Sequence, residues 1–136
     1  MIDKNCLIKM AISARKNAYA PYSGYTVGAA VLGEDEKIYS GSNIENASYP
    51  AGICAERTAI FKAVSEGNRK IKAIALSAAR EGEQPISYPS PCGICRQVMV
   101  EFADGDMPVF LVKNEDDYKE YTLAKLLPLS FTSKDL

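Results

Sequence analysis

Apolar residues recur at helical spacing over the N-terminal part of the chain. A repeat of three or four positions places such side chains along one stripe of a helix. The pattern predicts an amphipathic helix over residues 4–19, and Pro21 is expected to end it because the residue before a proline avoids the helical conformation. The positions that carry the repeat are Leu7, Met10, Ala11, Ala14 and Ala18.

Extended segments follow, and the first two form a predicted hairpin. A run rich in valine and alanine precedes the turn sequence Gly33-Glu34-Asp35-Glu36, and a second run returns from it. Two later apolar runs have the length of buried strands, and a last one is expected at a sheet edge. The predicted strands cover residues 26–32, 37–43, 72–79, 108–112 and 118–122.

Helical patterns alternate with these strands at residues 54–64, 93–102 and 123–127, and residues 80–91 form a proline-rich loop. Alternating strands and helices predict a mainly parallel sheet covered on both faces. The hairpin adds at least one antiparallel strand, so the sheet should be mixed. A chain of 136 residues without repeats or linkers predicts a single domain over residues 1–136.

Charge and composition narrow the function classes. The formal net charge is −1 and the basic residues are scattered, which argues against a nucleic-acid partner because such proteins usually present a basic patch. No apolar run is long enough to cross a bilayer, so no membrane partner is expected. The N-terminus lacks the basic and then apolar layout of a signal peptide, and a cytoplasmic location is therefore expected.

The cysteines point to chemistry. The chain has four cysteines and no histidine, and three of the cysteines cluster in motifs. A hydrolase with a Ser-His-Asp or Cys-His arrangement is therefore excluded. Any zinc site must use thiolates or carboxylates, and a cluster of three cysteines favours a metal site over paired disulfides.

Two motifs, each at the start of a predicted helix, carry this candidate metal site. They are Cys54-Ala55-Glu56 and Pro91-Cys92-Gly93-Ile94-Cys95. A catalytic zinc keeps three protein ligands and one open position, and helix N-termini lower cysteine pKa values toward the thiolate. The site is thus predicted to hold zinc through Cys54, Cys92 and Cys95. Glu56, two residues beyond the first ligand, is expected to move protons at the open position.

Three thiolates and one Zn²⁺ sum to a negative charge, which needs compensation. Arg57 follows Glu56 and Arg96 follows Cys95. We hypothesise that at least one of these arginines donates hydrogen bonds to a ligand sulfur and so supports the metal. The alternative is a closed structural site with Cys6 as fourth ligand. It is disfavoured because Cys6 lies within the amphipathic helix, where a small buried side chain is the simpler interpretation.

At these motifs the chain closely resembles the cytidine deaminases. The stretches that carry the resemblance are residues 19–23 (YAPYS), 27–30 (VGAA), 41–49 (GSNIENASY), 54–59 (CAERTA), 90–97 (SPCGICRQ) and 126–131 (LLPLSF). The resemblance implies an α/β fold, a three-layer α/β/α sandwich around a five-stranded mixed sheet. It also implies one zinc per subunit and hydrolytic deamination of cytidine or deoxycytidine to the uracil nucleoside and ammonia, a reaction of pyrimidine salvage. In that reaction Glu56 protonates N3 of the ring and assists the leaving amine.

The resemblance also assigns the substrate pocket. Asn43 and Glu45 match residues that bind the ribose 3′-hydroxyl, and Tyr25 stands where the family often has phenylalanine. The backbone N–H of Ala55 and the carbonyl of Ser90 match groups that read the cytosine edge. Phe131, like Tyr49, matches an aromatic residue that reaches a neighbouring subunit's site, so a homotetramer with shared active sites is implied.

Three rival functions remain at this point. A deaminase of an aminonucleoside antibiotic such as blasticidin S would share the cysteine motifs, but Asn43 with Glu45 favours an ordinary nucleoside. An enzyme that edits bases within nucleic acid would need a basic channel, which the charge does not provide. A structural zinc module would need a fourth ligand and would leave Glu56 without a task.

Overall fold

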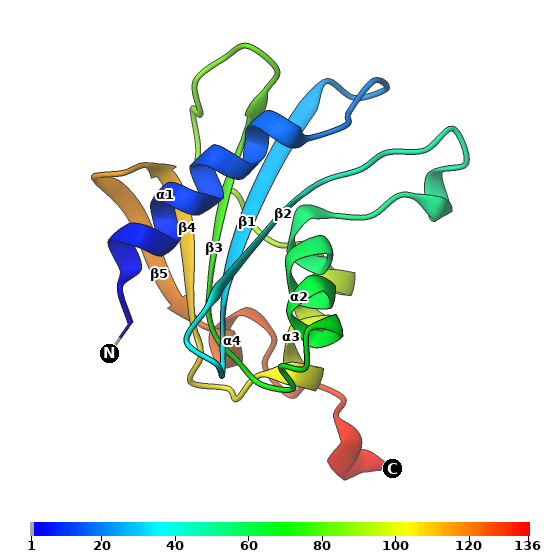
Figure 1. The fold of residues 1–136 in the computed structure, drawn as a ribbon. Coiled ribbons are helices and arrows are strands. Elements are labelled where there is room, and N and C mark those ends of the chain that lie inside the picture. Colours follow the sequence, from blue (N-terminus) through cyan, green and yellow to red (C-terminus); the bar gives the residue numbers. More distant parts are fainter. Residues whose placement is uncertain (1) are drawn as a thin grey trace.

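The computed structural model describes residues 2–136 and has a five-stranded sheet at its centre (Figure 1). The strands lie in the order β2-β1-β3-β4-β5. Only β3 and β4 pair in parallel, and the other three pairs are antiparallel. The strand bounds are Tyr25–Gly33 for β1, Ile38–Ser42 for β2, Ile71–Arg80 for β3, Pro108–Asn114 for β4 and Asp117–Thr122 for β5.

One face of the sheet is covered by α1 (Lys4–Ala14), which a short 3₁₀ turn, Arg15–Asn17, extends. Leu7, Ile8 and Ala11 pack there against side chains of β1, β3 and β4. Gly28 allows the helix to lie close to β1, because a Cβ atom at this position would stand 2.1 Å from the carbonyl oxygen of Ala11. The helix ends before the predicted residue 19, since Tyr19 instead forms a bridge with Ile44.

The opposite face is covered by α2 (Ala55–Ser65) and α3 (Gly93–Phe102), and α4 (Leu123–Leu126) closes one end of that layer (Figure 1). Alanines of α2 lie against the alternate residues of β1, so the two layers share the central strands. Gly41 again permits close contact, since a Cβ there would stand 2.6 Å from the backbone nitrogen of Ala59. The three-layer α/β/α sandwich around a five-stranded mixed sheet is therefore confirmed.

The prediction that the sheet is mainly parallel was wrong. The helix α2 joins β2 to β3, and these strands run in the same direction but are separated by β1. The hairpin strand β1 is antiparallel to both of its neighbours, so only β3 and β4 form a parallel pair. Because β2 and β3 run the same way, the helices that follow them, α2 and α3, begin at the same end of the sheet.

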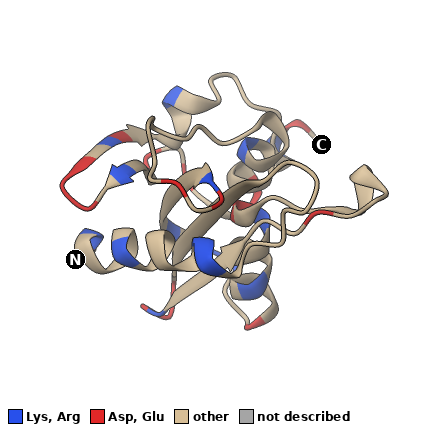
Figure 2. Cartoon of the chain, turned by 90° about the horizontal axis from the view of Figure 1, so that it is seen from above, with Lys and Arg blue, Asp and Glu red and all other residues tan. Residues whose placement is uncertain are grey.

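Charged residues of both signs are spread over several elements (Figure 2). Over residues 2–136, every helix is too short or too polar to span a bilayer. Among the exposed acidic and basic groups, Lys70 pairs with Asp104 and Lys72 with Glu36.

Candidate metal centre and substrate cavity

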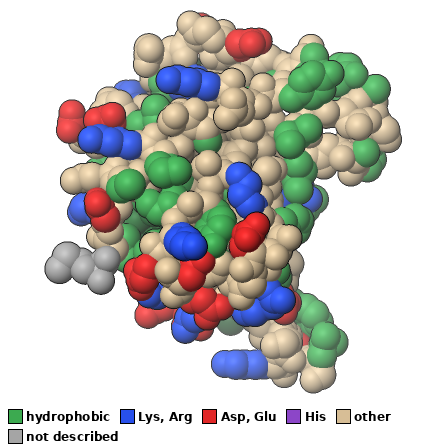
Figure 3. All heavy atoms as spheres, in the orientation of Figure 1, with side chains coloured by type: hydrophobic (Ala, Val, Ile, Leu, Met, Phe, Trp, Pro, Cys, Tyr) green, Lys and Arg blue, Asp and Glu red, His purple; other side chains and the backbone are tan. Residues whose placement is uncertain are grey.

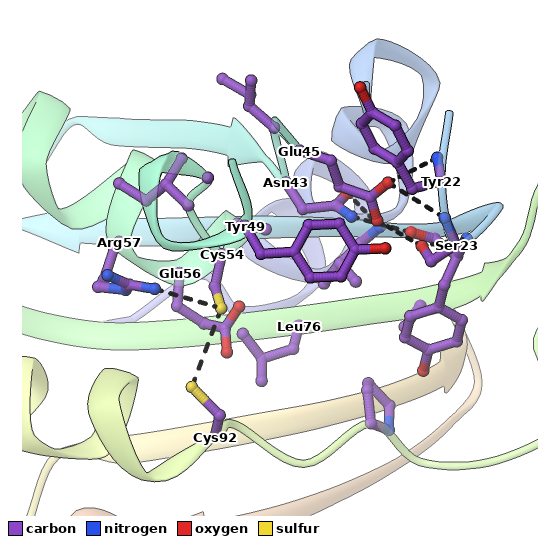
Figure 4. Close-up of a pocket in the computed structure, with 18 of the residues that line it drawn as sticks. Tyr22, Ser23, Asn43, Glu45, Tyr49, Cys54, Glu56, Arg57, Leu76 and Cys92 are labelled. Carbon is purple, nitrogen blue, oxygen red and sulfur yellow. Dashed lines mark hydrogen bonds between the residues drawn. The ribbon is translucent and has the colours of Figure 1, made fainter. Parts of the chain in front are cut away.

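Three cysteine sulfurs meet where α2 and α3 begin. The Sγ atoms of Cys54, Cys92 and Cys95 all lie within 4.8 Å of one another. Those of Cys54 and Cys92 are 3.9 Å apart (Figure 4). Tetrahedral zinc with Zn–S bonds of about 2.3 Å places two sulfur ligands roughly 3.8 Å apart. The three side chains would therefore fit as ligands of one zinc ion.

The two helix N-termini bring these sulfurs together. Cys54 is the N-cap of α2, Cys92 is the N-cap of α3, and Cys95 is the third residue of α3. Helix N-termini carry spare N–H groups and partial positive charge, which favour thiolates. Cys6 lies on α1, across the sheet, in a separate groove of about 240 Å³. The closed site with four cysteines is therefore contradicted.

The cluster shares its negative charge unevenly. A hydrogen bond with Cys95, helped by Arg57, lowers the pKa of Cys54 to about 5, although burial opposes the thiolate. The same hydrogen bond, together with burial, raises the pKa of Cys95 far above its ordinary value. A metal that binds all three sulfurs as thiolates must therefore displace protons from this cluster.

Glu56 is the buried carboxyl group of the site. It is the second residue of α2 and is only 5% exposed. In the close-up its carboxylate lies near the sulfur of Cys54 and beside Leu76 (Figure 4). Burial raises the pKa of Glu56 to about 7, and the charge of Cys54 contributes in the same direction. A carboxyl group with such a pKa can accept and release a proton near neutral pH.

Arg57 makes the hydrogen bond to sulfur that the charge argument predicts. Its Nη2 donates to the Sγ of Cys54 over 3.5 Å (Figure 4). Burial lowers the pKa of the guanidinium group, but hydrogen bonds to Cys54 and Cys95 outweigh that effect and raise it overall. The cation therefore compensates part of the negative charge of the cluster.

The hypothesis that at least one of the two arginines contacts a ligand sulfur is met by Arg57, whereas Arg96 makes other contacts. Its three nitrogens donate instead to oxygens of Ser90, Pro91 and Leu126. Arg96 follows Cys95 on the helix, but its side chain extends toward the loop before α3 and toward α4. Arg96 therefore donates to backbone and hydroxyl oxygens, and of the two arginines it is Arg57 that contacts sulfur.

A cavity of about 490 Å³ opens beside the cysteine cluster, a volume typical of sites for small molecules. Tyr25, Ala55 and Ser90 line it together with Cys54, Glu56 and Cys92. Ala55 is the first residue of α2, so its backbone N–H belongs to the unsatisfied first turn of the helix. The cysteine cluster thus forms part of the wall of a cavity that is large enough for a nucleoside.

Glu45 is fixed at the far side of this cavity. Its Oε1 accepts hydrogen bonds from the backbone N–H groups of Tyr22, at 2.9 Å, and Ser23, at 3.2 Å. The hydroxyl of Ser23 donates to Oε2 (Figure 4). These bonds, led by that of the Ser23 hydroxyl, lower the pKa of Glu45. The carboxylate is thus kept ionised and acts as an acceptor only.

Asn43 is held by the start of β1. Its Oδ1 accepts a hydrogen bond from the N–H of Val27 over 2.9 Å, and its Nδ2 donates to the carbonyl of Tyr25 over 2.8 Å. An amide nitrogen carries two hydrogens, and Asn43 lines the cavity. Asn43 and Glu45 are therefore both held in place by hydrogen bonds within the protein, and both line the cavity.

The two aromatic residues expected at a subunit boundary are both exposed. Tyr49 is 75% exposed, lines the cavity and has its ring 6.0 Å from that of Tyr22. Phe131 is 59% exposed on the C-terminal segment and lies outside the cavity lining of its own chain. Its carbonyl accepts a hydrogen bond from Nε2 of Gln97 over 2.8 Å.

Sequence reasoning missed the residues that hold the site. Tyr22 and Ser23 belong to a recognised stretch, but nothing local indicates that they bind Glu45, which lies more than twenty positions away. Gln97 directly follows Arg96, and its contact with Phe131 depends on where the C-terminal segment returns. Only the folded chain brings these groups together.

A buried glutamate that lies beside three thiolates without being one of the ligands is the arrangement used by zinc deaminases. The fold and the site together therefore define this protein by class as a zinc deaminase.

Comparison with known proteins identifies the family. Residues 1–111 match the family described as "Cytidine and deoxycytidylate deaminase zinc-binding region". A cytidine deaminase of Sporosarcina psychrophila is 53% identical over 99% of this chain and 96% of its own length. One of Halalkalibacterium halodurans is 49% identical over 99% and 98%, respectively. The crystal structure of cytidine deaminase from Burkholderia pseudomallei superposes with a TM-score of 0.85 at 41% identity, covering 96% of this chain and all of the other. The chain belongs to the cytidine and deoxycytidylate deaminase family.

The contact between Arg57 and Cys54 is open to a direct test. Replacing Arg57 with Gln removes the cation beside the thiolates, so we expect zinc affinity to fall about 10- to 100-fold. Competition with a chromophoric zinc chelator measures this. Arg69→Gln is the matched control, because Arg69 donates to the carbonyl of Val64 near the other end of α2. Equal zinc affinity and turnover in wild type and Arg57→Gln would contradict the assigned role.

Proposed function

We propose that this protein deaminates cytidine and deoxycytidine by hydrolysis, which yields uridine or deoxyuridine and ammonia. The observation that carries the proposal is the position of Glu56. It lies buried beside three convergent cysteine sulfurs and faces a cavity of about 490 Å³. The family relationship supports the same reaction, since the full-length relatives are named cytidine deaminases.

Cys54, Cys92 and Cys95 would hold one zinc ion per subunit. When bound, zinc supplies the Lewis acidity that makes water a nucleophile near neutral pH. The chain's own part is proton transfer by the carboxylate of Glu56. It takes one proton from the attacking water and delivers it to N3 of the ring, and it then carries the second proton of that water to the amine at C4. The water adds its oxygen to C4, the C–N bond breaks, and the nitrogen leaves as ammonia.

The base would be read by backbone groups. The N–H of Ala55 and the carbonyl of Ser90 supply a donor and an acceptor for the cytosine edge, and both residues line the cavity. The ring of Tyr25, at the start of β1, provides an aromatic wall. Because backbone groups make these contacts, side-chain chemistry alone does not reveal the choice of base.

The sugar would be bound by Asn43 and Glu45. One hydroxyl can donate to the ionised carboxylate of Glu45 and accept from the second hydrogen on Nδ2 of Asn43. Bonds from Tyr22 and Ser23 fix the carboxylate before a ligand arrives, so little entropy is lost on binding. A hydroxyl that must donate in this way is free, which favours a nucleoside over a continuing nucleic-acid strand.

Turnover of cytidine and deoxycytidine by zinc-loaded protein, followed by ultraviolet absorption, tests the proposed reaction. Glu56→Gln should bind one zinc and lose at least about 100-fold in kcat, because the proton carrier is gone and the ligands remain. Glu66→Gln, at the exposed C-cap of α2, is the matched control. A zinc-loaded wild-type protein inactive on both nucleosides would refute the proposed function.

The assembly we propose is a homotetramer with shared active sites. Apolar side chains gather on the projecting loop between β2 and α2 and on the C-terminal segment (Figure 3). Tyr49, Leu129 and Phe131 are among the large apolar residues exposed there. Burying such groups against a second copy is favourable, at about 25 cal/mol per Å², and exposed patches of this kind mark interaction surfaces.

Phe131→Ala should weaken this assembly or raise KM about tenfold, as expected of an interface residue worth about 1.4 kcal/mol. Sedimentation velocity and cytidine kinetics measure the two effects. Ile86→Ala, which truncates another exposed apolar residue, should change neither. A wild-type protein that is fully active as a monomer would argue against shared sites.

A further inference from the structure

Arg96 connects two parts of the chain that are far apart in sequence. Its Nε donates to the carbonyl of Pro91 over 2.8 Å, and its Nη2 donates to the hydroxyl of Ser90 over 2.6 Å. Its Nη1 donates to the carbonyl of Leu126 over 2.5 Å. One side chain on α3 thus holds both the loop that leads into Cys92 and the last residue of α4.

The loop before α3 needs an external anchor. Its sequence Pro89-Ser90-Pro91 contains two residues without a backbone N–H. Among residues 2–136, the hydrogen bonds found to Ser90 and Pro91 all come from Arg96. Cys92 follows this loop directly, so the placement of its sulfur depends on how firmly the loop is held.

The helix α4, to which Arg96 connects the loop, is itself held by hydrogen bonds and by burial. The N–H of Leu123 donates to the carbonyl of Met107, and the N–H of Ala124 donates to that of Gly105. Leu123 is fully buried in the same core as Cys95 and Met99. The carbonyl of Leu126 is therefore a stable point to which Arg96 can tie the loop.

We propose that Arg96 is a positioning residue of the metal site. It acts on the backbone that carries Cys92, and not on a ligand sulfur. The same contacts orient Ser90, which lines the cavity, and they make α4 part of the support of the metal centre. This inference rests on the proposed function, in which the cysteines hold zinc and Ser90 contacts the base. The observation that supports it is the set of three hydrogen bonds made by the guanidinium group of Arg96.

A role in positioning and a role in charge compensation predict different results for lysine. Lysine keeps the positive charge but lacks the planar fork that reaches three acceptors at once. If Arg96 positions the loop, Arg96→Lys and Arg96→Gln should both release zinc faster. If charge alone matters, Arg96→Lys should behave as wild type.

The experiment measures the rate at which zinc-loaded protein releases its metal to an excess of 4-(2-pyridylazo)resorcinol. We expect Arg96→Lys and Arg96→Gln to release zinc about 10- to 100-fold faster than wild type. Ser90→Ala, which removes one acceptor of three and keeps the arginine, should show a smaller increase. Arg69→Gln serves as control, and thermal unfolding is measured for every variant.

The proposal is overturned if Arg96→Lys, or both Arg96 variants, release zinc at the wild-type rate. The proposal would also be overturned if Arg69→Gln released zinc as fast as the Arg96 variants and had the same melting temperature as they do. The faster release would then reflect general destabilisation of the protein. Should both Arg96 variants be too unstable to purify, Ser90→Ala decides alone, and zinc release from it at the wild-type rate refutes the positioning role. Absence of cytidine turnover in wild type would refute the proposed function but leave the zinc-release result valid.

Discussion

Repulsion among three cysteine thiolates at one point is the main electrostatic problem that this fold has to solve. Three cysteine sulfurs lie within 4.8 Å of one another, and two unit charges about 4 Å apart repel by about 4 kcal/mol near a protein surface. Two helix N-termini and the guanidinium of Arg57 compensate part of this negative charge. A dication completes this compensation, which is why the arrangement is a metal site in its chemistry as well as its geometry.

The sheet topology brings two helix N-termini to one place. Strands β2 and β3 run in the same direction, so α2 and α3 begin at the same end of the sheet (Figure 1). Gly41 and the alanines of α2 let that helix lie close to the strands. The same end of the sheet carries Asn43 and Glu45 on the loop after β2, so these two residues line one cavity together with Cys54 and Cys92.

The sequence predicted what is local and missed what depends on tertiary contacts. Helix α3 was predicted with its observed bounds, and the cysteine motifs lie at helix starts as expected. The sheet was expected to be mainly parallel because alternation of strands and helices does not reveal that β1 inserts between β2 and β3. The partners of Arg96 could not be predicted either, since Leu126 lies 30 positions away, whereas Arg57 meets Cys54 within one helical turn.

We expect three thiolates, and no fourth protein ligand, to bind one zinc beside Glu56. X-ray absorption at the zinc edge of the loaded protein measures the number and kind of these ligands. We expect three sulfur scatterers at about 2.3 Å and one lighter oxygen or nitrogen neighbour at about 2.0 Å. Four sulfur neighbours would instead show a closed structural site, in which Glu56 has no open position beside it.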